Sequence, residues 1–237
     1  MDFSLAKNWF KSSGWSVFPF QREAWESHLN GINGIVNAPT GSGKTYSLMI
    51  PILLDIQKNK VPSGLQAIWV TPIRALAKEI LQSGSRAAEG MNIPARIEIR
   101  TGDTSAKDKA RIKKSPPHLL ITTPESLQVM LTQKHYAKYF ENLKTVVIDE
   151  WHDLIGGKRG VQMELALSKY KVLAPELKIW GISATIGNME ESLEVLLGNW
   201  FTERPFKMIR SGIKKKYQVE SVFPDNVEEL PLSLIHI

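Results

Sequence analysis

Short apolar runs alternate with amphipathic stretches along most of this chain. Runs rich in β-branched and aromatic residues predict strands over residues 32–36, 66–70, 118–121, 145–148 and 177–182, and residues 96–100 alternate like a half-buried strand. Apolar residues at helical spacing predict helices over residues 3–13, 22–29, 72–81 and 106–114, and a helix-like run starts at residue 46. Strands that alternate with helices predict an α/β fold, with a mostly parallel twisted sheet and helices on both faces.

Polar clusters follow these predicted strands. They begin at residues 38, 71, 101, 122, 149 and 183. In an open parallel sheet, ligands bind outside the carboxyl ends of the strands. We therefore expect the clusters to meet on one rim of the sheet and to form a single site there.

The segment from Ala38 to Thr45 lies between the first predicted strand and a helix. Its glycines let successive backbone N–H groups turn toward phosphate oxygens, and the helix adds its positive N-terminal end. Lys44 can reach a terminal phosphate, and the Thr45 hydroxyl can ligate Mg²⁺. The usual phosphate loop begins with Gly where this chain has Ala38, so an ordinary Gly-rich turn before a helix is the alternative.

Asp149 and Glu150 directly follow the β-branched run at 145–148. In a nucleotide hydrolase one carboxylate would hold Mg²⁺, and its neighbour would orient and deprotonate the attacking water. A lone Asp-Glu pair usually caps a helix or is solvated, but a phosphate loop requires a metal-binding acid at a strand end. We predict Lys44, Asp149 and Glu150 as catalytic residues, with Thr45 and Asp149 as metal ligands.

Composition narrows the class of protein. The formal charge of +6 and the pI near 9.4 favour an anionic partner. The chain has no cysteine, which excludes disulfides and thiolate metal sites and is compatible with a reducing compartment. Its start lacks the pattern of a signal peptide, and no uncharged run approaches the roughly 20 residues that span a bilayer. We expect a cytoplasmic protein with no membrane partner.

Six segments of the chain, in this order, resemble the motifs of superfamily 2 DExH-box helicases. They are Phe18–Gln21 (Q-motif), Ala38–Thr45 (motif I), Thr71–Ala77 (motif Ia), Thr122–Leu127 (motif Ic), Asp149–His152 (motif II) and Ser183–Thr185 (motif III). A tryptophan within the DExH box and the Phe-Pro-Phe-Gln segment are similar to the large helicase-related DNA helicases, in particular to the ligase-associated branch. The resemblance covers roughly residues 15–224 and implies a RecA-like P-loop NTPase domain.

The resemblance implies roles for individual residues, with ATP and Mg²⁺ as cofactors. The ATP-binding residues would be Gln21, which reads the adenine edge, together with Thr40, Gly41, Ser42, Gly43, Lys44 and Thr45. Coupling of nucleotide state to motion would involve His152, Ser183 and Thr185. Nucleic acid would contact Arg74, Thr101, Gly102, Thr123 and Glu125. The basic runs 113–114 and 214–216 are either solvated faces or further contacts.

The domain organisation is expected to be incomplete for a motor. We predict a RecA-like ATP-binding domain over residues 1–205 and, over 206–237, a connector toward a missing second RecA-like domain, with a truncated or non-native tail. The pattern that begins at residue 206 also fits two edge strands. The second domain would supply an arginine finger, so the isolated fragment should be weakly active or inactive.

The resemblance implies an ATP-dependent 3′-to-5′ helicase or translocase that acts in DNA repair. Single-stranded DNA is favoured over RNA, and a ligase or nuclease would be a repair partner. Two alternatives stay open: an RNA helicase of the same superfamily, and a nucleotide-gated nucleic-acid-binding module without motor activity.

Overall fold

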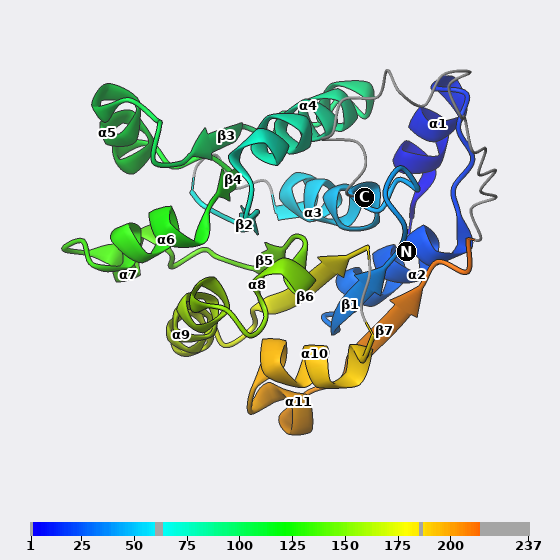
Figure 1. Cartoon of the computed structure of the whole chain (residues 1–237). Coiled ribbons are helices and arrows are strands. Elements are labelled where there is room, and N and C mark those ends of the chain that lie inside the picture. The colour runs from blue at the N-terminus through cyan, green and yellow to red at the C-terminus, as the bar shows by residue number, and fades with distance from the viewer. Residues whose placement is uncertain (1, 60–63, 185–186, 214–237) are drawn as a thin grey trace, which may run out of the picture.

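The computed structural model describes residues 2–59, 64–184 and 187–213 (Figure 1). These residues build a seven-stranded sheet in which every described strand pair is parallel. The strands are β1 (Asn33–Asn37), β2 (Ala67–Val70), β3 (Ile97–Arg100), β4 (Leu119–Thr122), β5 (Thr145–Ile148), β6 (Lys178–Ser183) and β7 (Phe206–Arg210). Their spatial order is β3-β4-β2-β5-β6-β1-β7. The predicted α/β fold with a parallel sheet is confirmed.

Helices cover both faces of the sheet (Figure 1). On one face are α1 (Ser4–Ser12), α2 (Pro19–Leu29), α3 (Tyr46–Asn59) and α4 (Arg74–Gly90). On the other are α5 (Ala106–Lys114), α6 (Pro124–Leu131), α7 (Tyr136–Tyr139), α8 (Trp151–Leu154), α9 (Lys158–Leu173), α10 (Met189–Leu197) and α11 (Trp200–Glu203). Neighbouring strand residues point to opposite faces, so Trp69 and Val147 enter the first core while Ile68 and Val146 enter the second.

The start of α4 differs from the prediction that Pro72 opens this helix. The backbone N–H of Thr71 still donates to the Thr122 carbonyl at 3.0 Å, which continues the pairing of β2 with β4. Ile73 is extended, with φ −115° and ψ 121°, and the helix begins at Arg74. The pairing with β4 therefore continues to Thr71, and the helix begins only after Ile73, so that residues 71–73 lie on the rim of the sheet.

Strand β7 extends the sheet beyond the predicted domain. Residues 206–209 were predicted as either an edge strand or part of a connector, and residues 206–210 pair in parallel with β1 as an edge strand. A Cβ at Gly34 of β1 would lie 2.4 Å from the Lys207 carbonyl and 2.7 Å from the Trp180 ring, so glycine is required for this close approach. The sheet thus continues to Arg210, past the predicted boundary at 205, whereas the division of the chain into domains stays a prediction.

None of the helices in the described part of the chain is long and apolar enough to cross a membrane. The basic run at 214–216 and the apolar tail lie outside the described residues.

Candidate nucleotide and nucleic-acid site

The loop from Ala38 to Thr45 joins the carboxyl end of β1 to α3. Gly41 and Gly43 adopt left-handed conformations, with φ +79° and +77°, which glycine reaches without steric cost. The Ala38 N–H donates to the Ser183 carbonyl at 3.1 Å, so the loop is fixed to the end of β6. The first turn of α3 follows Thr45 directly, and the N-terminal N–H groups of a helix bind phosphate.

Lys44 and Glu150 form an ion pair that joins the phosphate loop to the end of β5. The two side chains are 10% and 15% exposed, so water screens the pair only weakly. Glu150 has a left-handed backbone, with φ 48° and ψ 48°, an uncommon conformation for a non-glycine residue. Two motifs far apart in the sequence therefore meet at one point.

Asp149 lies beside this pair and is buried. One carboxylate oxygen accepts the indole N–H of Trp69 at 3.2 Å, and the other accepts the backbone N–H of Glu150 at 3.0 Å. Burial, and then the negative charge of Glu150, raise the pKa of Asp149 to about 6, while Lys44 and the two hydrogen bonds oppose this shift. The site therefore holds a carboxylate whose negative charge is poorly compensated.

The chemistry of these donors fits Mg²⁺. The described residues contain no group of three or more His, Asp or Glu side chains that could hold a metal by themselves. Mg²⁺ in nucleotide sites is instead bound by one or two carboxylates and by substrate phosphates. Asp149 and the Thr45 hydroxyl offer oxygen ligands of this kind, and a cation would compensate the charge of Asp149.

The pKa of Asp149 predicts a pH dependence of metal-assisted ATP binding. A carboxyl with a pKa of about 6 takes up a proton as the pH falls through 6, and a protonated carboxyl ligates Mg²⁺ poorly. We expect ATP affinity in the presence of Mg²⁺ to be level from pH 8 to 7 and to fall by up to about tenfold per pH unit below about 6. Titration of a fluorescent ATP analogue at several pH values, with EDTA as the control, measures this. An affinity that is level down to pH 5 would contradict it.

His152 contacts the end of β6. Its Nδ1 lies 2.7 Å from the Ser183 hydroxyl and 3.5 Å from a carboxylate oxygen of Glu150. The His152 imidazole therefore lies between Glu150, which pairs with the phosphate loop, and Ser183, which was predicted to couple nucleotide state to motion. Thr185, the third predicted coupling residue, lies outside the described residues.

Gln21 is buried against the phosphate loop. Its amide N–H₂ donates to the Gly43 carbonyl at 3.0 Å, and its carbonyl accepts the Phe18 N–H at 3.0 Å. Both ends of the amide thus make contacts within the protein, and one N–H and one lone pair stay available for an adenine edge. The adenine-reading role of Gln21 stays a prediction.

A cavity of about 540 Å³ opens beside Gln21 and the loop glycines. Its walls include the aromatic side chains of Trp15, Phe18 and Tyr46 and the cation of Arg86. Trp15 and Phe18 are 38% and 43% exposed, which is unusual for large apolar side chains and typical of ligand surfaces. Phe18 belongs to the segment that resembles the Q-motif, whereas Trp15, Tyr46 and Arg86 were not predicted as site residues, although Trp15 precedes Gln21 closely in the sequence.

A second cleft, of about 380 Å³, collects the predicted nucleic-acid residues. Its lining includes all five of them: Arg74, Thr101, Gly102, Thr123 and Glu125. They come from the carboxyl ends of three neighbouring strands, β2, β3 and β4, so the predicted meeting on one rim is confirmed for them. Arg100 and Lys109 also line the cleft and were not predicted.

Charges in this cleft are partly paired. Arg74 donates to both carboxylate oxygens of Asp103, at 2.6 and 2.8 Å, and Arg159 pairs with Glu125 at 2.7 Å. Both pairs are exposed and therefore weak. Thr123 caps α6, where its hydroxyl accepts the Ser126 N–H at 3.4 Å. The cleft thus offers hydroxyls, a helix start and cations, which are the groups that bind phosphates.

Comparison with known proteins places this geometry in a family. The model of the DEAD/DEAH box helicase family matches residues 18–192. The ATP-dependent helicase Lhr-Core of Methanocaldococcus jannaschii is 34% identical over 92% of this chain and 27% of its own length. The ATP-dependent DNA helicase Hel308 of the same organism is 31% identical over 86% of this chain and 17% of its own length. The chain therefore spans about a quarter or less of the length of these relatives.

A solved helicase structure agrees with this family assignment. The Mycobacterium smegmatis helicase Lhr bound to ssDNA and AMP-PNP superposes with a TM-score of 0.82 at 29% identity, over 90% of this chain and 28% of that one. The RecA-like fold and the resemblance to superfamily 2 helicases drawn from the sequence are thereby confirmed.

Proposed function

Because this chain belongs to the DEAD/DEAH box helicase family, we propose that it is the ATP-binding motor domain of a nucleic-acid translocase. The relatives Lhr-Core and Hel308 are ATP-dependent helicases. The observation that carries the proposal is the Lys44–Glu150 ion pair, which joins the phosphate loop to the acidic end of β5. ATP phosphates would lie on the loop, and the adenine would enter the aromatic cavity beside Gln21.

The residues of the chain would divide the work of hydrolysis. Lys44 is paired with Glu150 in the structure, and on ATP binding it would transfer to the terminal phosphates. The released Glu150 carboxylate would then orient a water and accept its proton. Mg²⁺, bound through Asp149 and Thr45, would neutralise charge that develops on the phosphates. His152 would transmit the movement of Glu150 to Ser183 through the 2.7 Å contact between His152 and Ser183.

The cleft of Arg74, Thr101 and Thr123 would hold one nucleic-acid strand. It lies on the same rim as the phosphate loop, since both follow the carboxyl ends of parallel strands. DNA is the proposed substrate, because the M. smegmatis helicase was solved with ssDNA and the M. jannaschii Hel308 relative is a DNA helicase. A 3′-to-5′ polarity and a role in DNA repair are proposed from the sequence resemblance.

A motor also requires a second domain that closes over ATP. The relatives are several times longer than this chain, and we propose that a second RecA-like domain of the longer polypeptide supplies an arginine finger, which raises the rate about 10³- to 10⁵-fold in comparable systems. The 237-residue chain by itself should therefore bind ATP and hydrolyse it slowly.

Substitution of Arg74 tests the nucleic-acid part of this proposal. We expect Arg74→Ala to weaken binding of a single-stranded DNA about fivefold to tenfold and to reduce its salt dependence, because the variant lacks one cation that binds a phosphate. Fluorescence anisotropy in the presence of Mg²⁺ and a non-hydrolysable ATP analogue measures both effects. Arg22→Ala is the matched control, since Arg22 also forms an exposed ion pair, with Glu26 at 2.9 Å on α2. Equal affinities of the two variants would refute the assignment of the cleft.

A further inference from the structure

A second basic cavity adjoins the nucleic-acid cleft. It has a volume of about 450 Å³ and lies between α5 and the segment around α7. The two cavities share Arg100, Lys113 and Gln133 as lining residues. A strand that follows the cleft can therefore continue into this cavity without leaving the protein surface.

The cavity is rich in uncompensated positive charge. Lys113 and Lys114 line it from α5, and Lys134 and Lys138 line it from the segment around α7. All four side chains are exposed, and none of them forms an ion pair with another residue in the described ranges. Glu141 is the one carboxylate among the described lining residues. Such a concave surface attracts anions.

Arg100 lies at the junction of the two cavities and is only 5% exposed. Its guanidinium donates to the carbonyl and the hydroxyl of Ser126, at 3.1 and 3.0 Å. It forms no ion pair with any carboxylate in the part of the chain that the structure describes. A buried guanidinium with no counterion is costly, so this position favours an anionic ligand.

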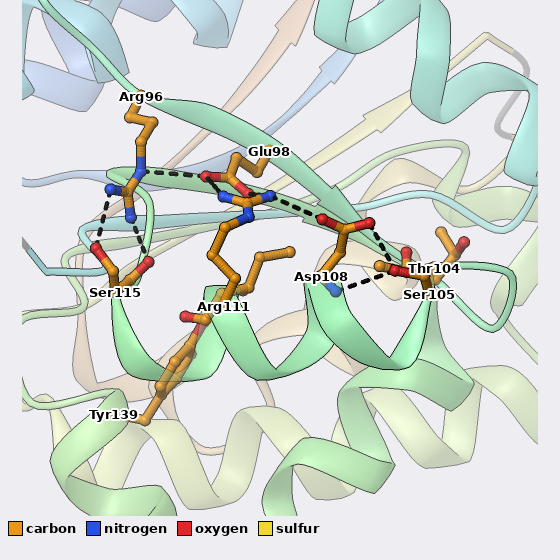
Figure 2. A network of polar contacts seen from close by, with 10 residues as sticks. Arg96, Glu98, Thr104, Ser105, Asp108, Arg111, Ser115 and Tyr139 are labelled. Carbon is orange, nitrogen blue, oxygen red and sulfur yellow. Dashed lines mark hydrogen bonds and ion pairs between the residues drawn. The ribbon is translucent and has the colours of Figure 1, made fainter.

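The nearest acidic side chain on the same strand is already engaged. Glu98, two residues before Arg100 on β3, accepts from Arg96 at 3.2 Å and from Arg111 at 2.8 Å (Figure 2). Arg111 also lies 3.5 Å from Asp108, whose backbone N–H donates to the hydroxyl of Ser105, the residue that caps the start of α5. This network fixes α5 against β3 and leaves the Arg100 charge for a group from outside.

We propose that this cavity is a phosphate-binding subsite that extends the nucleic-acid path beyond the cleft. Arg100 would lie at the junction of the two cavities, and Lys113, Lys134 and Lys138 would surround the nucleic-acid backbone. The proposal rests on the proposed function, because the strand reaches the subsite through the cleft. The half-buried ring of Tyr136 lines the same cavity and offers a stacking surface for a base.

Oligonucleotides of two lengths test the subsite. A single strand of about 4 nucleotides fills one cavity, whereas about 10 nucleotides reach both. We expect the wild-type chain to bind the longer strand more tightly. We expect Lys134→Glu/Lys138→Glu to weaken binding of the longer strand roughly 10- to 30-fold at about 0.1 M salt. The slope of log affinity against log salt concentration should fall by about 0.7 for each phosphate that the variant no longer neutralises. Binding of the short strand and of ATP should not change.

The control carries the same charge change elsewhere. Lys7→Glu/Lys11→Glu alters two exposed lysines on α1, on the opposite face of the sheet, and should bind the longer strand within about twofold of wild type if long-range charge is not the cause. Equal melting temperatures of the two double variants show that both fold. If both double variants weaken the longer strand equally, or neither does, the subsite is refuted.

Two further outcomes separate this proposal from its premise. If the wild-type chain binds the short strand through the cleft but binds the longer strand no more tightly, the proposed function stands and the subsite fails. If neither strand binds, the proposed function fails and the subsite fails with it. A third outcome is that the wild-type chain binds inorganic pyrophosphate, that Lys134→Glu/Lys138→Glu does not, and that DNA affinity does not depend on strand length. This outcome would show that the cavity holds a free anion and would overturn the proposed path of the strand.

Discussion

Lys44→Met should lower the free energy of unfolding of the ligand-free chain by about 3 kcal/mol and abolish detectable ATP binding. The substitution leaves Glu150, which is 15% exposed, without its cation and next to the buried Asp149. An uncompensated carboxylate in such a place is strongly destabilising. Urea unfolding without nucleotide measures the first effect, and titration of a fluorescent ATP analogue with Mg²⁺ measures the second.

A double variant separates the two effects. Lys44→Met/Glu150→Gln removes both charges of the pair, so we expect it to recover about 2 kcal/mol of the stability that Lys44→Met removes, while ATP binding stays absent. Arg22→Met is the control for loss of an ion pair, because the Arg22–Glu26 pair is exposed and should contribute little. If the destabilisations of Lys44→Met and Glu150→Gln simply add in the double variant, the ion pair does not contribute to the fold.

Acid should destabilise the chain through His28. This side chain is fully buried, its Nε2 lies 3.0 Å from the Thr145 hydroxyl, and its Nδ1 lies 3.7 Å from Asp55, which is itself paired with Lys178. Burial, and then the charge of Lys178, hold the pKa of His28 well below 6.5. The unfolded chain takes up a proton below pH 6.5 and the folded chain does not, so stability is full above 6.5 and falls by about 1.4 kcal/mol per pH unit below it.

Asp149 acts in the opposite direction over part of this range. Because its pKa is raised to about 6, the folded state binds a proton before the unfolded state does, and stability rises as the pH falls from about 6 toward 3.8. The pH dependence of wild-type stability is therefore the sum of the two contributions, and a variant is needed to isolate that of His28.

His28→Gln provides that variant. We expect it to be about 1 kcal/mol less stable than the wild type at pH 7.5, because glutamine replaces the Thr145 contact imperfectly, and to gain about 2 kcal/mol relative to the wild type between pH 6.5 and 5. Urea unfolding at several pH values measures the difference. His135→Gln, at an exposed position, should keep the wild-type pH dependence. Parallel curves for His28→Gln and the wild type would mean that His28 is not held neutral by the fold.

Some elements were predictable because the signals that form them are local. The helix Ala106–Lys114 was predicted with its observed bounds, since Ser105 precedes it and its side chain accepts the Asp108 N–H at 3.0 Å. The strand Thr145–Ile148 was also predicted with its bounds, because β-branched residues buried on both faces form a continuous run.

Other elements gave no such signal. The helix α9 carries exposed Val161, Leu165 and Val172 as well as buried Met163 and Leu167, so apolar side chains occur around its circumference and no single face stands out. The edge strand β7 has exposed Lys207 and Met208, so its sequence fits an edge strand and a connector equally. It is a strand because β1 offers its free edge and Gly34 lets it approach.

The same distinction holds for the site. The sequence alone was enough to locate the phosphate loop, the acidic pair and the polar segments at strand ends, because each depends on a few consecutive residues. The contact of Lys44 with Glu150, the position of His152 against Ser183 and the uncompensated charge of Arg100 depend instead on the strand order β3-β4-β2-β5-β6-β1-β7. That order results from long-range packing of two cores, which no local pattern encodes, and it is what brings distant charges close enough to shift a pKa or to bind a strand.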